Sequence, residues 1–133
     1  MLKIISAFRA LALTAAGALT LSAAAYAAAA DYAFEPVSAE IKSGKGSEVA
    51  VRLINKATGK PVSGAVLFRT QLDMSPDGMG GMLAEHKAMP AEEPGVYKFH
   101  ADLSMAGGWA LKIMAKVPGE ADTVQGTVVF QAK

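Results

Sequence analysis

The sequence predicts an all-β protein, an immunoglobulin-like β-sandwich of about seven strands preceded by a cleavable signal peptide. Beyond residue 31, apolar side chains alternate with other side chains at the two-residue period of β-strands. Turns rich in Gly and Pro separate these runs at intervals of roughly 8–12 residues, as in two-sheet sandwiches. No later segment carries a convincing capped helix, which argues against helical fold classes.

Residues 1–27 have the pattern of a secretory signal peptide. Lys3 and Arg9 give a positive start, a short apolar run follows, and Ala25-Tyr26-Ala27 supplies small residues around a cleavage site. No stop-transfer pattern follows this run, which favours a cleaved peptide over a membrane anchor. We therefore expect an exported protein whose mature form has no stable membrane anchor.

The runs that justify the expected strands follow one another in a regular order. They are residues 49–54, 66–72, 96–101, 109–114 and 124–130. In each run apolar side chains recur at every second position, so that one face can be buried. Trp109 is the expected central aromatic residue of the core. We interpret residues 31–133 as one small domain, since this length is typical of a single core.

Composition excludes several function classes. Without residues 1–27 the chain has 11 basic and 12 acidic residues, a net charge of −1, which argues against nucleic acid as a partner. It contains no cysteine, so an exported domain would have no disulfide and any metal ligands would be Met, His or carboxylate. Nucleophile elbows, zinc-protease motifs and phosphate-binding loops are lacking, so we expect no enzyme.

Methionine is concentrated in the second half of the sequence. Six of the seven methionines lie within residues 74–114, and Met74, Met79 and Met82 stand among Pro and Gly, where a core does not easily form. Thioether sulfur binds soft ions such as Cu(I) and Ag(I). Gly80-Gly81 would let the backbone fold back and bring these thioethers to one ion. The alternative is that one or two of them are apolar anchors beneath a loop.

Two further residues are candidates for completing such a site. Met105 precedes Gly107-Gly108, and because loops cluster at the ends of a sandwich it could meet the methionine-rich turn. Packing of Met105 on Trp109 is an equal alternative. His86 forms a His-x-x-Met pair with Met89, and imidazole is a common metal ligand, but a solvated histidine is the alternative.

Other residues with suitable chemistry are expected to lie outside the site. His100 falls on the strand face opposite the aromatic side chains and is expected at the surface, and Met114 is expected to be structural or exposed. Asp73 and Asp77 are expected to cap turns or to offset the charge of an ion. A calcium site would need six or more oxygen ligands, which this segment lacks.

Four segments, taken in order, resemble the YtkA-like/FixH-like periplasmic domain family. They are Gly59–Val66, the methionine-rich turn, Pro94–Tyr97 and Met105–Leu111. The resemblance extends over about residues 45–131 and implies an immunoglobulin-type sandwich. It also implies a role in heavy-metal efflux or in copper delivery to respiratory oxidases. Membrane-bound relatives of the oxidase-assembly kind keep an N-terminal anchor, and the expected signal peptide here favours a free periplasmic protein.

Together these patterns lead to two main hypotheses. The first is a monomeric periplasmic Cu(I)-binding protein that acts as a copper chaperone or heavy-metal efflux accessory, with a metal-efflux or copper-delivery protein as its partner. The second is a protein-interaction module of an efflux or oxidase-assembly complex, whose methionines form an adaptable surface. A weaker third hypothesis is a sink for oxidants, because exposed methionine oxidises reversibly to its sulfoxide.

Overall fold

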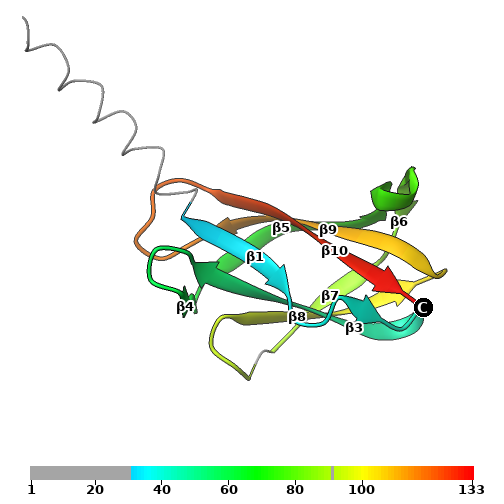
Figure 1. Ribbon diagram of the computed structural model, residues 1–133, viewed down its shortest axis with the longest axis horizontal. Helices are drawn as coiled ribbons and strands as arrows, with labels where there is room; N and C mark the ends of the chain where they lie inside the picture. Colours follow the sequence, from blue (N-terminus) through cyan, green and yellow to red (C-terminus); the bar gives the residue numbers. More distant parts are fainter. Residues whose placement is uncertain (1–30, 91) are drawn as a thin grey trace, which may run out of the picture.

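The computed structural model describes residues 31–90 and 92–133 of the chain (Figure 1). The expected signal peptide, residues 1–27, lies outside the described residues. Within the described part, no helix is long and apolar enough to cross a membrane.

Two five-stranded sheets face each other (Figure 1). The first sheet has the order β1 (Tyr32–Pro36), β3 (Gly44–Asn55), β8 (Val96–Leu103) and β7 (His86–Met89), and β4 (Lys60–Pro61) pairs with β3. The second sheet has the order β2 (Glu40–Ile41), β10 (Val124–Ala132), β9 (Gly107–Lys116), β5 (Val66–Met74) and β6 (Met79–Leu83). All pairs are antiparallel except β2 with β10.

The expected immunoglobulin-like sandwich is confirmed by this strand order. The first, third, eighth and seventh strands form one sheet, and the tenth, ninth and fifth form the centre of the other, which is the order of an immunoglobulin domain. The described residues contain more strands than the expected seven or so. The strands outside the five alternating runs are β1, the two-residue β2 and β4, and β6 and β7, of which the last two lie in a segment where the alternation is weak.

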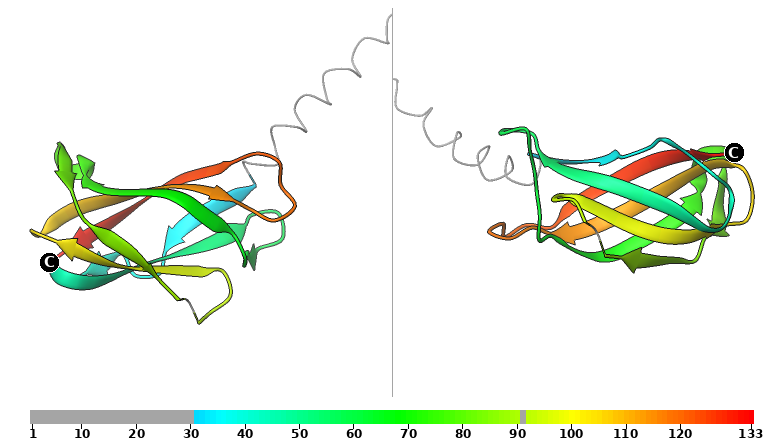
Figure 2. Two further views of the ribbon diagram at one scale, coloured as in Figure 1. Left: turned by 180° about the vertical axis from the view of Figure 1, so that it is seen from behind. Right: turned by 90° about the horizontal axis from the view of Figure 1, so that it is seen from below.

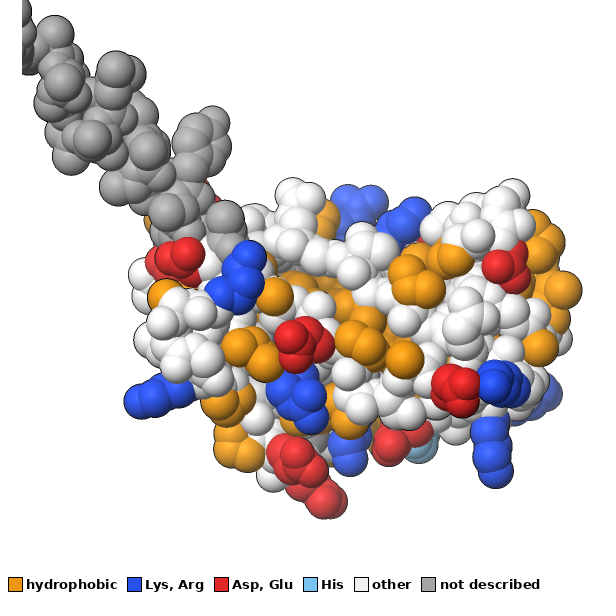
Figure 3. All heavy atoms as spheres, viewed as in Figure 1, with side chains coloured by type: hydrophobic (Ala, Val, Ile, Leu, Met, Phe, Trp, Pro, Cys, Tyr) orange, Lys and Arg blue, Asp and Glu red, His pale blue; other side chains and the backbone are white. Residues whose placement is uncertain are grey.

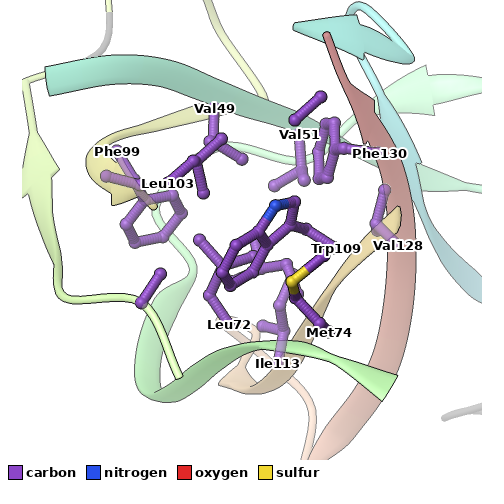
Figure 4. Close-up of a cluster of buried hydrophobic side chains, with 14 of the residues drawn as sticks. Val49, Val51, Leu72, Met74, Phe99, Leu103, Trp109, Ile113, Val128 and Phe130 are labelled. Carbon is purple, nitrogen blue, oxygen red and sulfur yellow. The ribbon is translucent and has the colours of Figure 1, made fainter. Parts of the chain in front are cut away.

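The core lies between the sheets and is centred on Trp109, as expected (Figure 4). The alternation along β3 is confirmed, because Val49, Val51 and Leu53 are all fully buried. Phe130 of β10 packs in the same cluster as Trp109 and is equally buried. Since the chain contains no cysteine, these apolar contacts provide the main stabilisation of the domain.

The alternation expected along β5 is interrupted by a bulge. The register between β5 and β9 shifts between Leu67 and Arg69, so that one extra residue is accommodated. Leu67 therefore packs against the core, whereas Val66 and Phe68 remain 61% and 50% exposed. Beyond the bulge, Leu72 returns to the core as expected.

Candidate functional site

The methionine-rich segment is a hairpin at one end of the sandwich. β5 ends at Met74, the 3₁₀ turn η1 (Ser75–Asp77) follows, and β6 returns alongside β5 (Figure 1). The turn is closed by Gly78, whose N–H donates to the Ser75 carbonyl oxygen over 2.9 Å and whose φ of 76° suits glycine. Met79 then pairs directly opposite Met74. The segment expected as a flexible turn is thus largely β-structure.

Met74 is part of the hydrophobic core. Its side chain is fully buried, and its sulfur lies beside the indole of Trp109 (Figure 4). Sulfur–aromatic contacts of this kind favour packing. The sequence left two roles open for these methionines, metal ligand or apolar anchor. The buried position of Met74 is that of an apolar anchor.

Three other methionines are exposed at this end of the molecule. Met79 and Met82 of β6 are 37% and 38% exposed, and Met105 in the β8–β9 loop is 41% exposed. Leu83, at the end of β6, is 62% exposed. Hydrophobic side chains are accordingly visible at the end of the surface that carries the hairpin (Figure 3).

The expectation that Gly80-Gly81 folds the backbone back is wrong. Both glycines continue the extended strand β6 from Met79 to Leu83. In regular β-structure, side chains three positions apart point to opposite faces, but residues 80–82 lie between the paired positions Met79 and Leu83 and have no paired position of their own on β5. A register shift beside Met74 shows that the pairing in this hairpin is irregular.

The loop that carries Met105 is held against the methionine hairpin. The Gly108 N–H donates to Asp77 Oδ2 over 3.0 Å, which links η1 to the start of β9. A β-carbon at Gly107 would lie 2.8 Å from Met74 Cε and would also meet the Asp77 carboxylate, so glycine permits this close approach. The indole N–H of Trp109 donates to the Met105 carbonyl oxygen over 3.1 Å. The loop backbone is therefore anchored to both the hairpin and the core.

We expect Gly107→Ala to destabilise the domain more than Gly119→Ala. Both glycines have a positive φ, 136° and 88°, but only at Gly107 would a β-carbon collide with neighbouring atoms. Backbone strain alone costs about 1 kcal/mol, and displacement of the η1 turn should add about 1–2 kcal/mol at Gly107. Urea unfolding of the two variants measures the difference. Equal losses of stability would show that the close approach of Gly107 to Met74 and Asp77 does not contribute to stability.

His86 joins the edges of the two sheets. The chain passes from β6 in the second sheet to β7 in the first along one side of the sandwich (Figure 2). Here His86 Nδ1 lies 3.1 Å from the Ala84 carbonyl oxygen and Nε2 lies 2.7 Å from Thr70 Oγ1. Because a carbonyl only accepts, Nδ1 carries a proton, and in the neutral ring Nε2 accepts from the threonine hydroxyl. The ring also contacts Phe99 edge to face at 5.8 Å between centroids.

The remaining candidates occupy the positions expected of them. His100 is exposed on the outer face of β8, and Met114 is partly exposed on β9. Among the residues that the structure describes, there is no group of three or more His, Cys, Asp or Glu side chains that could hold a metal ion.

Asp73, next to Met74 in the hairpin, is a buried carboxylate with several hydrogen-bond partners. Its Oδ1 accepts the Ser75 N–H over 2.9 Å, which confirms the expected turn-capping role. Its Oδ2 accepts from Gln71 Nε2 over 2.8 Å and lies 3.1 Å from Lys112 Nζ. Burial by itself would raise the pKa of Asp73, but the hydrogen bonds from Ser75, Gln71 and Lys112 outweigh it and hold the pKa well below its ordinary value. The pairing of Asp73 with Lys112 has no local signature in the sequence, because it joins two neighbouring strands.

The chain is similar to one protein family and to several solved structures. A family model described as YtkA-like matches residues 26–114. Among solved structures, the crystal structure of the Lin-41 filamin domain covers 72% of this chain and 91% of its own, with 19% identity and a TM-score of 0.41. A ZirS C-terminal domain covers 100% of this chain and 87% of its own, with 8% identity and a TM-score of 0.41. No curated protein matches the chain.

Proposed function

Because this chain belongs to the YtkA-like family, we propose that it is a periplasmic protein that binds Cu(I) through methionine thioethers and exchanges it with a copper-delivery or metal-efflux partner. One observation carries the proposal. Two segments that touch at one end of the sandwich expose three thioethers, those of Met79, Met82 and Met105. Thioether sulfur is a preferred ligand of Cu(I), and Ag(I) would bind in the same way.

The proposed ligand set is narrower than the one expected from the sequence. Met74 would have to leave its contact with Trp109 to reach an ion, and His86 would have to give up two hydrogen bonds. Met79, Met82 and Met105 are already accessible to solvent. We therefore assign the ion to these three thioethers, with Met74 as a support of the hairpin and His86 as a link between the sheets.

The proposed ligands have two chemical consequences. Thioethers are neutral and lose no proton on binding, so affinity should depend little on pH between 6 and 8, a range that would change the charge of a histidine ligand with an ordinary pKa of about 6.5. Exposure of the sulfurs would also let a partner replace them one at a time, which suits a protein that passes its ion on.

Binding by both thioethers of β6 depends on the backbone between them. Gly80-Gly81 lies in the irregular part of the hairpin, and glycine is the residue at which a rotation that brings the two thioethers to one ion costs least. A β-carbon at Gly81 would meet nothing within 4 Å, and one at Gly80 only Ser75 Cβ at 3.9 Å. The two glycines are therefore not needed for packing.

We expect the double substitution Gly80→Ala and Gly81→Ala to weaken Cu(I) binding about tenfold while leaving the unfolding free energy within about 1 kcal/mol of wild type. Alanine restricts the rotation but fits the extended strand. Competition titration and urea unfolding measure the two quantities. Unchanged affinity would show that the ion does not need both thioethers of β6.

The direct test of the function is an anaerobic titration with Cu(I) against a chromophoric chelator. We expect one ion per chain, accompanied by a change in the emission of Trp109, the only tryptophan, because its indole N–H holds the Met105 carbonyl. Failure of the protein to compete for Cu(I) would contradict the proposal.

A second function is favoured by the same exposed end. Met79, Met82 and Leu83 of β6 are exposed apolar side chains, and methionine adapts readily to different partners. In that case the domain would be an interaction module of an efflux or oxidase-assembly complex. Replacing Met79 and Met82 by leucine separates the two functions, because leucine keeps the apolar surface and removes the sulfur.

A further inference from the structure

A groove of about 500 Å³ opens between the sheets, away from the methionine hairpin. Its walls come from the start of β5, from β7 and from the loop that leads into β8. Leu67, Ala88 and Phe99 provide an apolar floor. The hydrogen bond between His86 and Thr70 joins β5 to β7 beside this groove and keeps its two walls together.

Free strand edges border the groove. β5 pairs with β9 on one side. On its other side β6 covers β5 from Asp73 onward and the Ala84 N–H donates to the Leu72 carbonyl oxygen over 2.8 Å, so within the described structure residues 66–71 present an open edge, interrupted by the bulge between Leu67 and Arg69. β7 pairs with β8 on one side and ends the first sheet. A long edge with exposed apolar side chains is a template for an added strand, and Val66 and Phe68 are both exposed here. β7, with four residues, is a shorter template.

The charged residues at the mouth of the groove indicate which charge a bound partner should carry. Glu92 and Glu93 lie exposed along its rim. Lys98, which also lines the groove, has its ammonium 3.9 Å from Glu48 on the outer face of the first sheet. The rim therefore favours a positively charged group.

We infer that this groove binds an extended polypeptide segment that adds to the open edge of β5, inserts alternate apolar side chains toward Leu67 and Phe99, and places a Lys or Arg beside Glu92 and Glu93. Main-chain hydrogen bonds to β5 would give affinity, and the groove and its acidic rim would select the sequence. The inference is independent of copper binding, since it uses none of the proposed thioether ligands.

Selection from a library of displayed random peptides tests the inference with the purified protein as bait. We expect enriched peptides in which β-branched or aromatic residues alternate with polar ones and which carry a Lys or Arg. The variant Ala88→Arg fills the groove and should bind them at least about tenfold more weakly. Ala121→Arg, at an exposed turn outside the groove, is the matched control and should bind like wild type.

A second variant, with the charge of the rim reversed, tests the inference even if Ala88→Arg misfolds. Glu92 and Glu93 are exposed, so the double substitution Glu92→Lys and Glu93→Lys leaves the core untouched. We expect the same selection on this variant to enrich acidic peptides instead. The inference is overturned if no alternating pattern is enriched, if Ala88→Arg binds normally, or if the preference for basic residues survives charge reversal.

Discussion

Replacing Met79, Met82 and Met105 together by leucine is expected to lower the affinity for Cu(I) by at least about 100-fold, because all three soft ligands are removed. Leucine has nearly the volume of methionine, and these side chains are exposed, so the unfolding free energy should change by less than about 1.5 kcal/mol. Competition titration of the variant beside wild type measures the loss.

Met74→Leu is the matched control for the triple variant. Met74 is fully buried against Trp109, so the substitution keeps the core filled and removes a sulfur that the proposed site does not use. Its Cu(I) affinity should equal that of wild type. Loss of binding in Met74→Leu, with binding retained in the triple variant, would transfer the site from the exposed thioethers to the core.

Asp73→Asn is expected to lower the unfolding free energy by about 1–3 kcal/mol, because the hydrogen bonds of a buried carboxylate are disrupted. The amide can still accept the Ser75 N–H, but its NH₂ group would face the donors of Gln71 and Lys112. Gln71 and Lys112, whose side chains are exposed, would lose their partner, and the buried amide would lie against two donors. Urea unfolding at neutral pH measures the effect, with the exposed Asp102→Asn, which alters the contact to the Gly46 N–H, as a milder control.

The lowered pKa of the Asp73 carboxylate should make the stability of the domain depend on pH. The pKa of Asp73 is lowered in the folded protein, so the unfolded chain takes up its proton first as the pH falls. The stabilisation is fully present above about pH 5 and decreases below the ordinary aspartate pKa of about 3.9. The difference in stability between wild type and Asp73→Asn should therefore narrow in acid. A difference that stays constant from pH 7 to pH 3 would contradict the assigned network.

The central strands could be predicted because burial imposes a two-residue period on them. Trp109 and the β3 residues Val49, Val51 and Leu53 followed this rule. The bulge at Phe68 could not be predicted, since it arises from the register of β5 against β9, a contact between distant segments. β6 could not be predicted for a different reason. Its two glycines carry no side chains that could alternate, and the strand is defined mainly by its pairing with β5.

The surroundings of the candidate site could be predicted only in part. The sequence indicated thioethers and the proximity of the β8–β9 loop, but not the burial of Met74, which follows from its position opposite Trp109 in the core. The bond from Gly108 to Asp77 joins residues 31 positions apart and has no local signature. The hydrogen bonds of His86 likewise depend on Thr70 in the facing sheet.

Methionine-methyl NMR during titration with Ag(I) tests the proposed thioether site most directly, because Ag(I) resembles Cu(I) in its ligand preference and each methyl group reports its own sulfur. We predict that the Met79, Met82 and Met105 signals shift together and saturate at one ion per chain, while the Met74 and Met114 signals stay in place. Unchanged spectra, or a shift of Met74 without the other three, would contradict the account.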